Sequence, residues 1–132
     1  LEIDRSFGEA AATKHMRRFY LAVRGDDLRG EDRLIGAPPA VAAGWRLRFH
    51  LHPGVKASLA RDNRSIILAL PNREGWRFRS NCRRIAIERS IYCGEGGMPQ
   101  STEQIVINAG VLEDAGDEDM VVRWSFRRMD TA

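Results

Sequence analysis

Hydrophobic and polar residues alternate along most of this chain, and the alternation is clearest in Gly44–Pro53. The apolar positions of this segment are Trp45, Leu47, Phe49 and Leu51, and the polar positions are Arg46, Arg48, His50 and His52. Successive side chains of a β-strand point to opposite faces, so a period of two predicts a strand with one face in a core. We therefore predict a half-buried strand here, with two arginines and two histidines on its outer face.

Other segments repeat this period, with turn-forming residues between them about every 8–12 residues. Strands are predicted at Leu1–Phe7, Lys14–Val23, Leu28–Ile35, Val55–Ala60, Ser65–Leu70, Gly75–Ser80, Arg83–Tyr92, Glu103–Ala109 and Met120–Arg128. The C-terminal end of Lys14–Val23 is apolar on both faces, which indicates burial on both. Loops or turns are predicted at Gly8–Thr13, Gly36–Gly44, Gly94–Ser101 and Gly110–Asp119, and no segment predicts a convincing helix. About eight to ten short strands of this kind are typical of an all-β, antiparallel two-sheet β-sandwich.

The length of 132 residues suits one domain, so we expect residues 1–132 to form a single β-sandwich. The composition, with 43% hydrophobic and 30% charged residues, is that of a globular protein. No apolar run is long enough for a transmembrane helix, and the N-terminus lacks the layout of a signal peptide. The chain begins without Met and its first residues read as part of a strand, so we expect a C-terminal fragment of a longer protein.

The chain is basic, with a formal net charge of +3 and a pI of about 9.3. Lys14 and Lys56 are the only lysines among its 21 basic residues, so the rest are arginines. A basic protein can attract nucleic acid or an acidic polysaccharide. The arginines alternate with apolar residues and do not cluster along the chain, which favours solvated strand faces. We predict no nucleic-acid binding.

Three motifs with chemical meaning are absent or incomplete. Cys82 and Cys93 flank one predicted strand, which at about 3.3 Å per residue holds them too far apart for a disulfide. The glycine-rich segment Gly94–Ser101 lacks the Gly-Lys-Ser/Thr ending of a phosphate-binding loop. The acidic segment Gly110–Asp119 lacks the spacing of a calcium loop. These features argue against a cysteine zinc site, a nucleotide site and a calcium site.

Five phrases in order resemble the β-sheet region of bacterial heparinase II/III-like proteins. They are His15–Leu21 (HMRRFYL), Leu28–Asp32 (LRGED), Arg48–Pro53 (RFHLHP), Gly75–Arg79 (GWRFR) and Thr102–Val106 (TEQIV). The resemblance extends from about His15 to Arg128 and so covers most of the chain. Members of that family are polysaccharide lyases built from an N-terminal α/α toroid and a C-terminal β-sandwich region. They cleave uronate-containing polysaccharides by β-elimination.

The resemblance implies a role inside a larger protein. The toroid and the upstream G-H-x-H-x-D-type segment have no counterpart in this chain, so we expect the fragment alone to be inactive and to contain no catalytic residue. It would support the toroid, line the substrate cleft, and meet the acidic polysaccharide through the full-length protein, in the periplasm or cell envelope. The alternatives are a stand-alone carbohydrate-binding or interaction module without catalysis, and a purely structural sandwich.

The candidate substrate-binding residues are Arg46, Arg48, His50 and His52. The two imidazoles would lie about 7 Å apart on one strand face, and the neighbouring arginines favour a carboxylate or sulfate over a cation. The same four side chains also fit a solvated face or, less well, a metal site.

His15 is the metal candidate, because a histidine from this region of related lyases helps to bind a structural divalent metal. The resemblance places its partners in the upstream segment, and a zinc site needs three or four ligands. The alternative is a hydrogen-bonded histidine at the start of a strand. Core or core-edge packing is predicted for Tyr20 and Tyr92, and core packing for the three tryptophans, Trp45, Trp76 and Trp124.

Overall fold

The computed structural model describes residues 2–7, 10–94, 96–111 and 119–130. Its strands are β1 (Glu2–Phe7), β2 (Ala10–Leu21), β3 (Asp27–Ile35), β4 (Arg46–His50), β5 (Lys56–Leu59), β6 (Ser65–Ala69), β7 (Gly75–Ser80), β8 (Ile85–Cys93), β9 (Pro99–Asn108) and β10 (Asp119–Arg128). The described helices are α1 (Pro39–Ala43) and a 3₁₀ turn (Ala109–Val111), and neither is long or apolar enough to cross a membrane.

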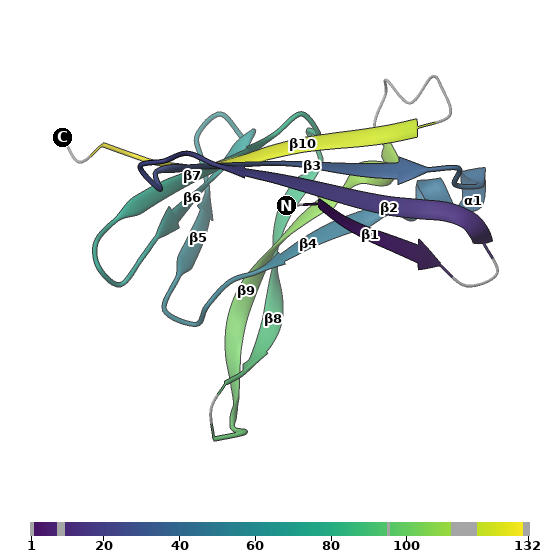
Figure 1. Ribbon diagram of the computed structural model, residues 1–132. Helices are drawn as coiled ribbons and strands as arrows, with labels where there is room; N and C mark the ends of the chain where they lie inside the picture. The colour runs from purple at the N-terminus through teal and green to yellow at the C-terminus, as the bar shows by residue number, and fades with distance from the viewer. Residues whose placement is uncertain (1, 8–9, 95, 112–118, 131–132) are drawn as a thin grey trace.

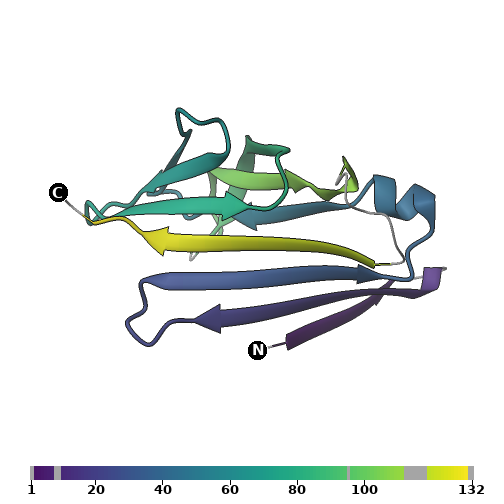
Figure 2. The same cartoon turned by 90° about the horizontal axis from the view of Figure 1, so that it is seen from above.

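The strands form two antiparallel sheets in two layers, as Figures 1 and 2 show. The large sheet has the order β1-β2-β3-β10-β7-β6-β5, and the small sheet has the order β4-β9-β8. The last strand, β10, lies between β3 and β7, so segments distant in sequence become neighbours. The predicted all-β, two-sheet sandwich is confirmed.

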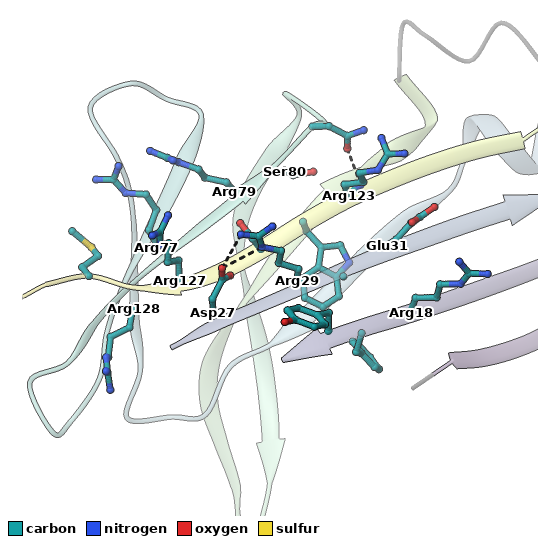
Figure 3. Close-up of a pocket in the computed structure, with 17 residues that line it drawn as sticks. Arg18, Asp27, Arg29, Glu31, Arg77, Arg79, Ser80, Arg123, Arg127 and Arg128 are labelled. Carbon is teal, nitrogen blue, oxygen red and sulfur yellow. Dashed lines mark hydrogen bonds and ion pairs between the residues drawn. The ribbon is translucent and has the colours of Figure 1, made fainter. Parts of the chain in front are cut away.

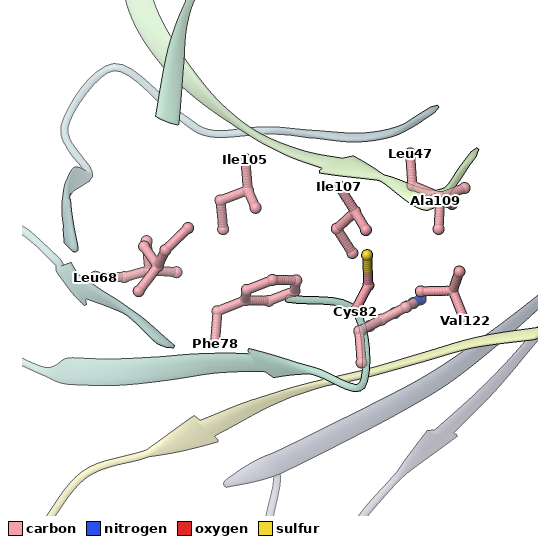
Figure 4. Close-up of a cluster of buried hydrophobic side chains, with 10 residues drawn as sticks. Leu47, Leu68, Phe78, Cys82, Ile105, Ile107, Ala109 and Val122 are labelled. Atoms are coloured by element: carbon pink, nitrogen blue, oxygen red, sulfur yellow. The ribbon is translucent and has the colours of Figure 1, made fainter. Parts of the chain in front are cut away.

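The core lies between the two sheets, where the apolar faces of their strands meet. Leu47, Ile105 and Ile107 come from the small sheet, and Ile66, Leu68, Phe78, Val122 and Trp124 come from the large sheet (Figure 4). The alternation in each strand places arginines between these residues on the outside. Core packing of the tryptophans is confirmed, since Trp124 is buried and Trp45 and Trp76 pack against the cluster. Cys82 is buried, Cys93 is exposed, and both are free thiols.

Three loop predictions and the absence of a helix are wrong in part. β9 begins at Pro99, inside the predicted loop Gly94–Ser101. β2 already begins at Ala10, inside the predicted loop Gly8–Thr13. The loop predicted at Gly36–Gly44 contains the five-residue helix α1, whose first turn starts with Pro39. Proline is favoured at the first position of a helix because its missing N–H has no partner there and its φ is already helical. Leu1, Gly8, Glu9 and residues 112–118 of the predicted acidic turn lie outside the described residues.

The predicted burial of both faces at the end of β2 is also wrong. Tyr20 is 64% exposed, Leu21 is 60% exposed and Val23 is fully exposed. No described element covers the outer face of the large sheet beside Tyr20, because the small sheet packs on the other face. Leu21 is the last residue of β2 and Val23 lies just beyond the strand. Tyr92, the next-to-last residue of β8, is exposed as well, so core-edge packing is wrong for both tyrosines. The β8–β9 hairpin projects from the sandwich (Figure 1).

Candidate anion-binding face

A buried carboxylate, that of Asp32, joins three strands on the inner side of the large sheet. Asp32 on β3 has no exposed surface and lies on the same face of the strand as the buried Leu34. Its Oδ1 accepts a hydrogen bond from Arg17 Nε at 2.6 Å and bonds His15 Nε2 at 2.6 Å. Its Oδ2 accepts a hydrogen bond from Trp124 Nε1 at 2.6 Å. The cluster therefore ties β2, β3 and β10 together through one carboxylate.

The charge of Asp32 is stabilised despite its burial. Burial alone would raise its pKa, but the hydrogen bonds from His15, Arg17 and Trp124, together with the positive charge of Arg17, hold the pKa below its ordinary value of 3.8. The Arg17 guanidinium also lies 5.3 Å from the ring centroid of Phe49 on the small sheet. The same cluster therefore links the two sheets.

Gly30 makes the bond between Trp124 and Asp32 possible. Gly30 is the cross-strand partner of Trp124, and a Cβ at this position would overlap the indole ring. Without that Cβ the indole lies against β3 and its Nε1 reaches Asp32, two residues along the same strand. The phrases His15–Leu21 and Leu28–Asp32 of the sequence thus meet in one cluster. No role for Asp32 is predicted from the sequence. The available signal is an acidic residue at a position of the strand that alternation assigns to the apolar face.

The outer face of β2, β3, β10 and β7 forms an open hollow of about 830 Å³, which we call the arginine groove (Figure 3). Its arginines are Arg18, Arg29, Arg77, Arg79, Arg123, Arg127 and Arg128, and its carboxylates are Asp27 and Glu31. The arginines of β7 and β10 alternate with the buried Phe78 and Trp124, so the pleat of the sheet turns them outward. The exposed Tyr20 lies at one side of the groove.

The carboxylates near the groove neutralise only part of this charge. Asp27 Oδ2 accepts two hydrogen bonds from Arg29, at 3.0 Å and 3.2 Å. Glu31 pairs with Arg33 at 2.9 Å, and Glu74 lies 3.9 Å from Arg128. Of the five arginines of β7 and β10, Arg128 is the one paired with Glu74. Within the described residues, the other four form no ion pair; they are Arg77, Arg79, Arg123 and Arg127. The charge of Arg77 also acts on the carboxylate of Asp62. The guanidiniums of Arg79, Arg123 and Arg127 are open to an anionic ligand.

The four predicted substrate-binding residues lie on the opposite outer face of the sandwich. Arg46, Arg48 and His50 follow the outer face of β4, and Arg48 is 4.0 Å from Glu88. His50 Nδ1 bonds Ser90 Oγ at 2.7 Å.

His52 lies beyond the end of β4, with its ring 5.1 Å from that of Tyr92. Since Ser90 and Tyr92 both belong to β8, the two histidines still reach the same strand. Their role in substrate binding stays a prediction.

His15 lies inside the sandwich, beside Trp45 and Asp32. Among the described residues, no three histidine, cysteine, aspartate or glutamate side chains gather closely enough to hold a metal ion. His15 and Asp32 would supply two ligands at most, so these residues alone do not fit a structural zinc site. A metal role for His15 stays a prediction that requires ligands from elsewhere in a longer protein.

Comparison with known proteins gives one curated relative and one family. The chain is 34% identical over 122 residues to FtsZ-localized protein C of Caulobacter vibrioides (strain NA1000 / CB15N). The alignment covers 86% of this chain and 20% of that protein, so the chain spans about a fifth of the relative's length. No solved structure matches. Residues 5–125 match the family described as Heparinase II/III-like, C-terminal, and the chain therefore belongs to that family.

Proposed function

We propose that this chain is the non-catalytic β-sheet domain of a heparinase II/III-like polysaccharide lyase, and that its arginine groove holds an acidic polysaccharide. One observation carries the proposal: four guanidiniums of β7 and β10 face a hollow of about 830 Å³ and form no ion pair among the described residues, namely those of Arg77, Arg79, Arg123 and Arg127. In the full-length protein the domain would support the catalytic toroid and form one wall of the substrate cleft.

The chemistry of the groove fits a chain of uronates. A guanidinium offers a planar fork of donors that matches a carboxylate or sulfate in bidentate geometry. Neighbouring strands lie about 4.8 Å apart, so the groove presents several cations spread over four strands and suits an extended ligand that carries repeated charges. The exposed ring of Tyr20 beside Arg29 adds an apolar surface on which a sugar ring can pack.

A second candidate is an interaction module without catalysis. It is favoured by the relative whose printed name is FtsZ-localized protein C, because that name describes localisation and no reaction. In this case the groove would bind an acidic segment of a protein partner. The two candidates share the groove and differ in its ligand.

The test is calorimetric titration of the chain with a short uronate oligosaccharide at low ionic strength. We expect the paired change Arg79→Gln with Arg123→Gln to weaken binding about ten-fold or more, since a hydrogen bond to a charged group contributes about 1.5–3 kcal/mol. Arg46→Gln with Arg48→Gln and His50→Ala with His52→Ala remove the same kinds of side chain from the opposite face. These variants also test the substrate-binding role predicted for the same four residues from the sequence. Binding is retained if the groove holds the ligand and is lost if the outer face of the small sheet holds it.

Three results would count against the proposal. If the β4 variants lose binding and the groove variants keep it, the ligand lies on the small sheet. If the chain prefers poly-glutamate to the oligosaccharide, the interaction module is the better assignment. The full-length protein should also release an unsaturated, ultraviolet-absorbing product from a uronate polysaccharide, and failure to do so on a panel of such substrates would remove the lyase assignment.

A further inference from the structure

Two polar atoms of the arginine groove are buried and have no hydrogen-bond partner. They are Asp27 Oδ1 and Arg77 Nε, one an acceptor and the other a donor. A buried polar atom without a partner costs about 1–3 kcal/mol, so such atoms in a folded protein call for an explanation. Both atoms belong to residues that line the groove, so a ligand could supply the missing partners once the two side chains turn to expose them.

Both atoms belong to one row of side chains that crosses three strands. Asp27 on β3 faces Arg127 on β10, and Arg127 faces Arg77 on β7. Figure 3 shows Arg77 and Arg127 side by side, with Asp27 next to Arg127 and bonded to Arg29. Like charges directly opposite each other on neighbouring strands are destabilising. The row therefore combines two opposed cations, an unused donor and an unused acceptor.

The row requires a ligand that is both anionic and a hydrogen-bond donor. An acidic group satisfies Arg77 and Arg127, but it has no proton to donate to Asp27 Oδ1. A sugar hydroxyl donates and accepts, and on a uronate or sulfated ring it lies close to the acidic group. Inorganic polyphosphate supplies acceptors alone and would leave the Asp27 carboxylate facing a phosphate of like charge.

We infer that the Asp27–Arg127–Arg77 row binds a hydroxyl and a neighbouring acidic group of one sugar, and so selects acidic carbohydrates over bare polyanions. This inference rests on the proposed function for the place of binding and adds the residues that determine specificity. Asp27 accepts the hydroxyl proton, and the two guanidiniums hold the anion. A carboxylate inside a cationic groove then contributes to selectivity, because a ligand without a donor is repelled.

The experiment compares two ligands on three forms of the chain. Affinities for a short uronate oligosaccharide and for inorganic polyphosphate are measured for the unchanged chain, Asp27→Ala and Glu31→Ala. We expect Asp27→Ala to weaken oligosaccharide binding about ten-fold and to strengthen polyphosphate binding. Glu31→Ala removes the other groove carboxylate and is expected to strengthen both. The shape-conserving Asp27→Asn gives the same comparison if the alanine variant does not fold.

The outcomes separate this inference from the proposed function. If Asp27→Ala strengthens oligosaccharide and polyphosphate binding alike, Asp27 is only a repelling charge and the inference is overturned, while arginine-dependent oligosaccharide binding still stands. If the unchanged chain binds polyphosphate or poly-glutamate and not the oligosaccharide, the proposed function fails and takes the inference with it. If Asp27→Ala weakens oligosaccharide binding and strengthens polyphosphate binding, the result supports both the inference and the proposed function.

Discussion

At the scale of single residues, Asp32 is the point at which separate parts of the sequence meet. Three side chains from two other strands, β2 and β10, bond a carboxylate that has no contact with solvent. Such a group is stabilising only as a complete set, because removal of the anion leaves the remaining partners buried with unmet hydrogen bonds.

We expect Asp32→Asn to lower the free energy of unfolding by about 3–5 kcal/mol at neutral pH, the range for breaking a buried ion pair. Since the folded-state pKa of Asp32 lies below its ordinary value, this stabilisation is present above about pH 4, near the pKa of an unfolded aspartate, and is lost as the pH falls through the folded-state pKa. Urea unfolding from neutral to acidic pH measures it.

The exposed Glu88 is the control for this prediction. Glu88→Gln removes a carboxylate that lies 4.0 Å from Arg48 at the surface, and we expect its effect to stay within about 1 kcal/mol. A difference between the unchanged chain and Asp32→Asn that stays constant down to the most acidic pH would contradict the assigned role of the Asp32 charge.

At the scale of elements, the pairing of β3 with β10 depends on a missing side chain. Gly30 and Trp124 are directly opposite each other, and the indole occupies the space that a Cβ on Gly30 would need. A glycine inside a strand ordinarily weakens it. Here it lets an aromatic ring approach the backbone and complete the Asp32 cluster.

We expect Gly30→Ala to destabilise the domain by about 1–3 kcal/mol, because the new methyl group displaces Trp124 from Asp32. Thermal unfolding gives the loss, and near-ultraviolet circular dichroism reports the altered tryptophan environment. Gly44→Ala is the matched control, since its Cβ would meet nothing closer than 3.9 Å. Equal losses of stability from the two changes would show that the loss at Gly30 does not come from the displaced indole.

At the scale of the whole molecule, one aromatic residue carries much of the contact between the layers. Phe49 of the small sheet lies 5.4 Å from Phe78, 4.8 Å from Trp124 and 5.6 Å from Phe126, measured between ring centroids. These edge-to-face and tilted geometries are the favourable ones for aromatic pairs. The large sheet provides the groove, and the small sheet gives it a rigid support from behind.

We therefore expect Phe49→Ala to lower the free energy of unfolding of the entire domain by about 2–4 kcal/mol, in one cooperative transition. Ile91→Ala is the control on the same sheet, because Ile91 is 70% exposed on the β8–β9 hairpin. Chemical denaturation followed by fluorescence and by far-ultraviolet circular dichroism tests both. Transitions that differ between the two probes would show that the sheets unfold separately.

The sequence alone predicted the strands, their inner and outer faces, and the family, because side-chain alternation is a local property of each strand. It also placed Trp45, Leu47 and Phe49 toward the core correctly. Its errors included the helix at Pro39–Ala43, the starts of β2 and β9, and the exposure of Tyr20 and Tyr92. A proline at the first position of a short helix is a weak local signal, because proline is also common in loops. The exposure of Tyr20 depends on whether another layer of the fold covers its face of the sheet.

The tertiary structure alone decided which strands are neighbours. The alternation in β3, β7 and β10 turns Asp27, Arg77 and Arg127 outward, but nothing local states that β10 lies between the other two. That strand order depends on pairing between segments distant in the chain, and it converts arginines that read as separate solvated faces into one groove. The same pairing brings Asp32 to Trp124. The sequence therefore fixes the chemistry of each strand face, while long-range strand pairing determines which of these side chains can act together.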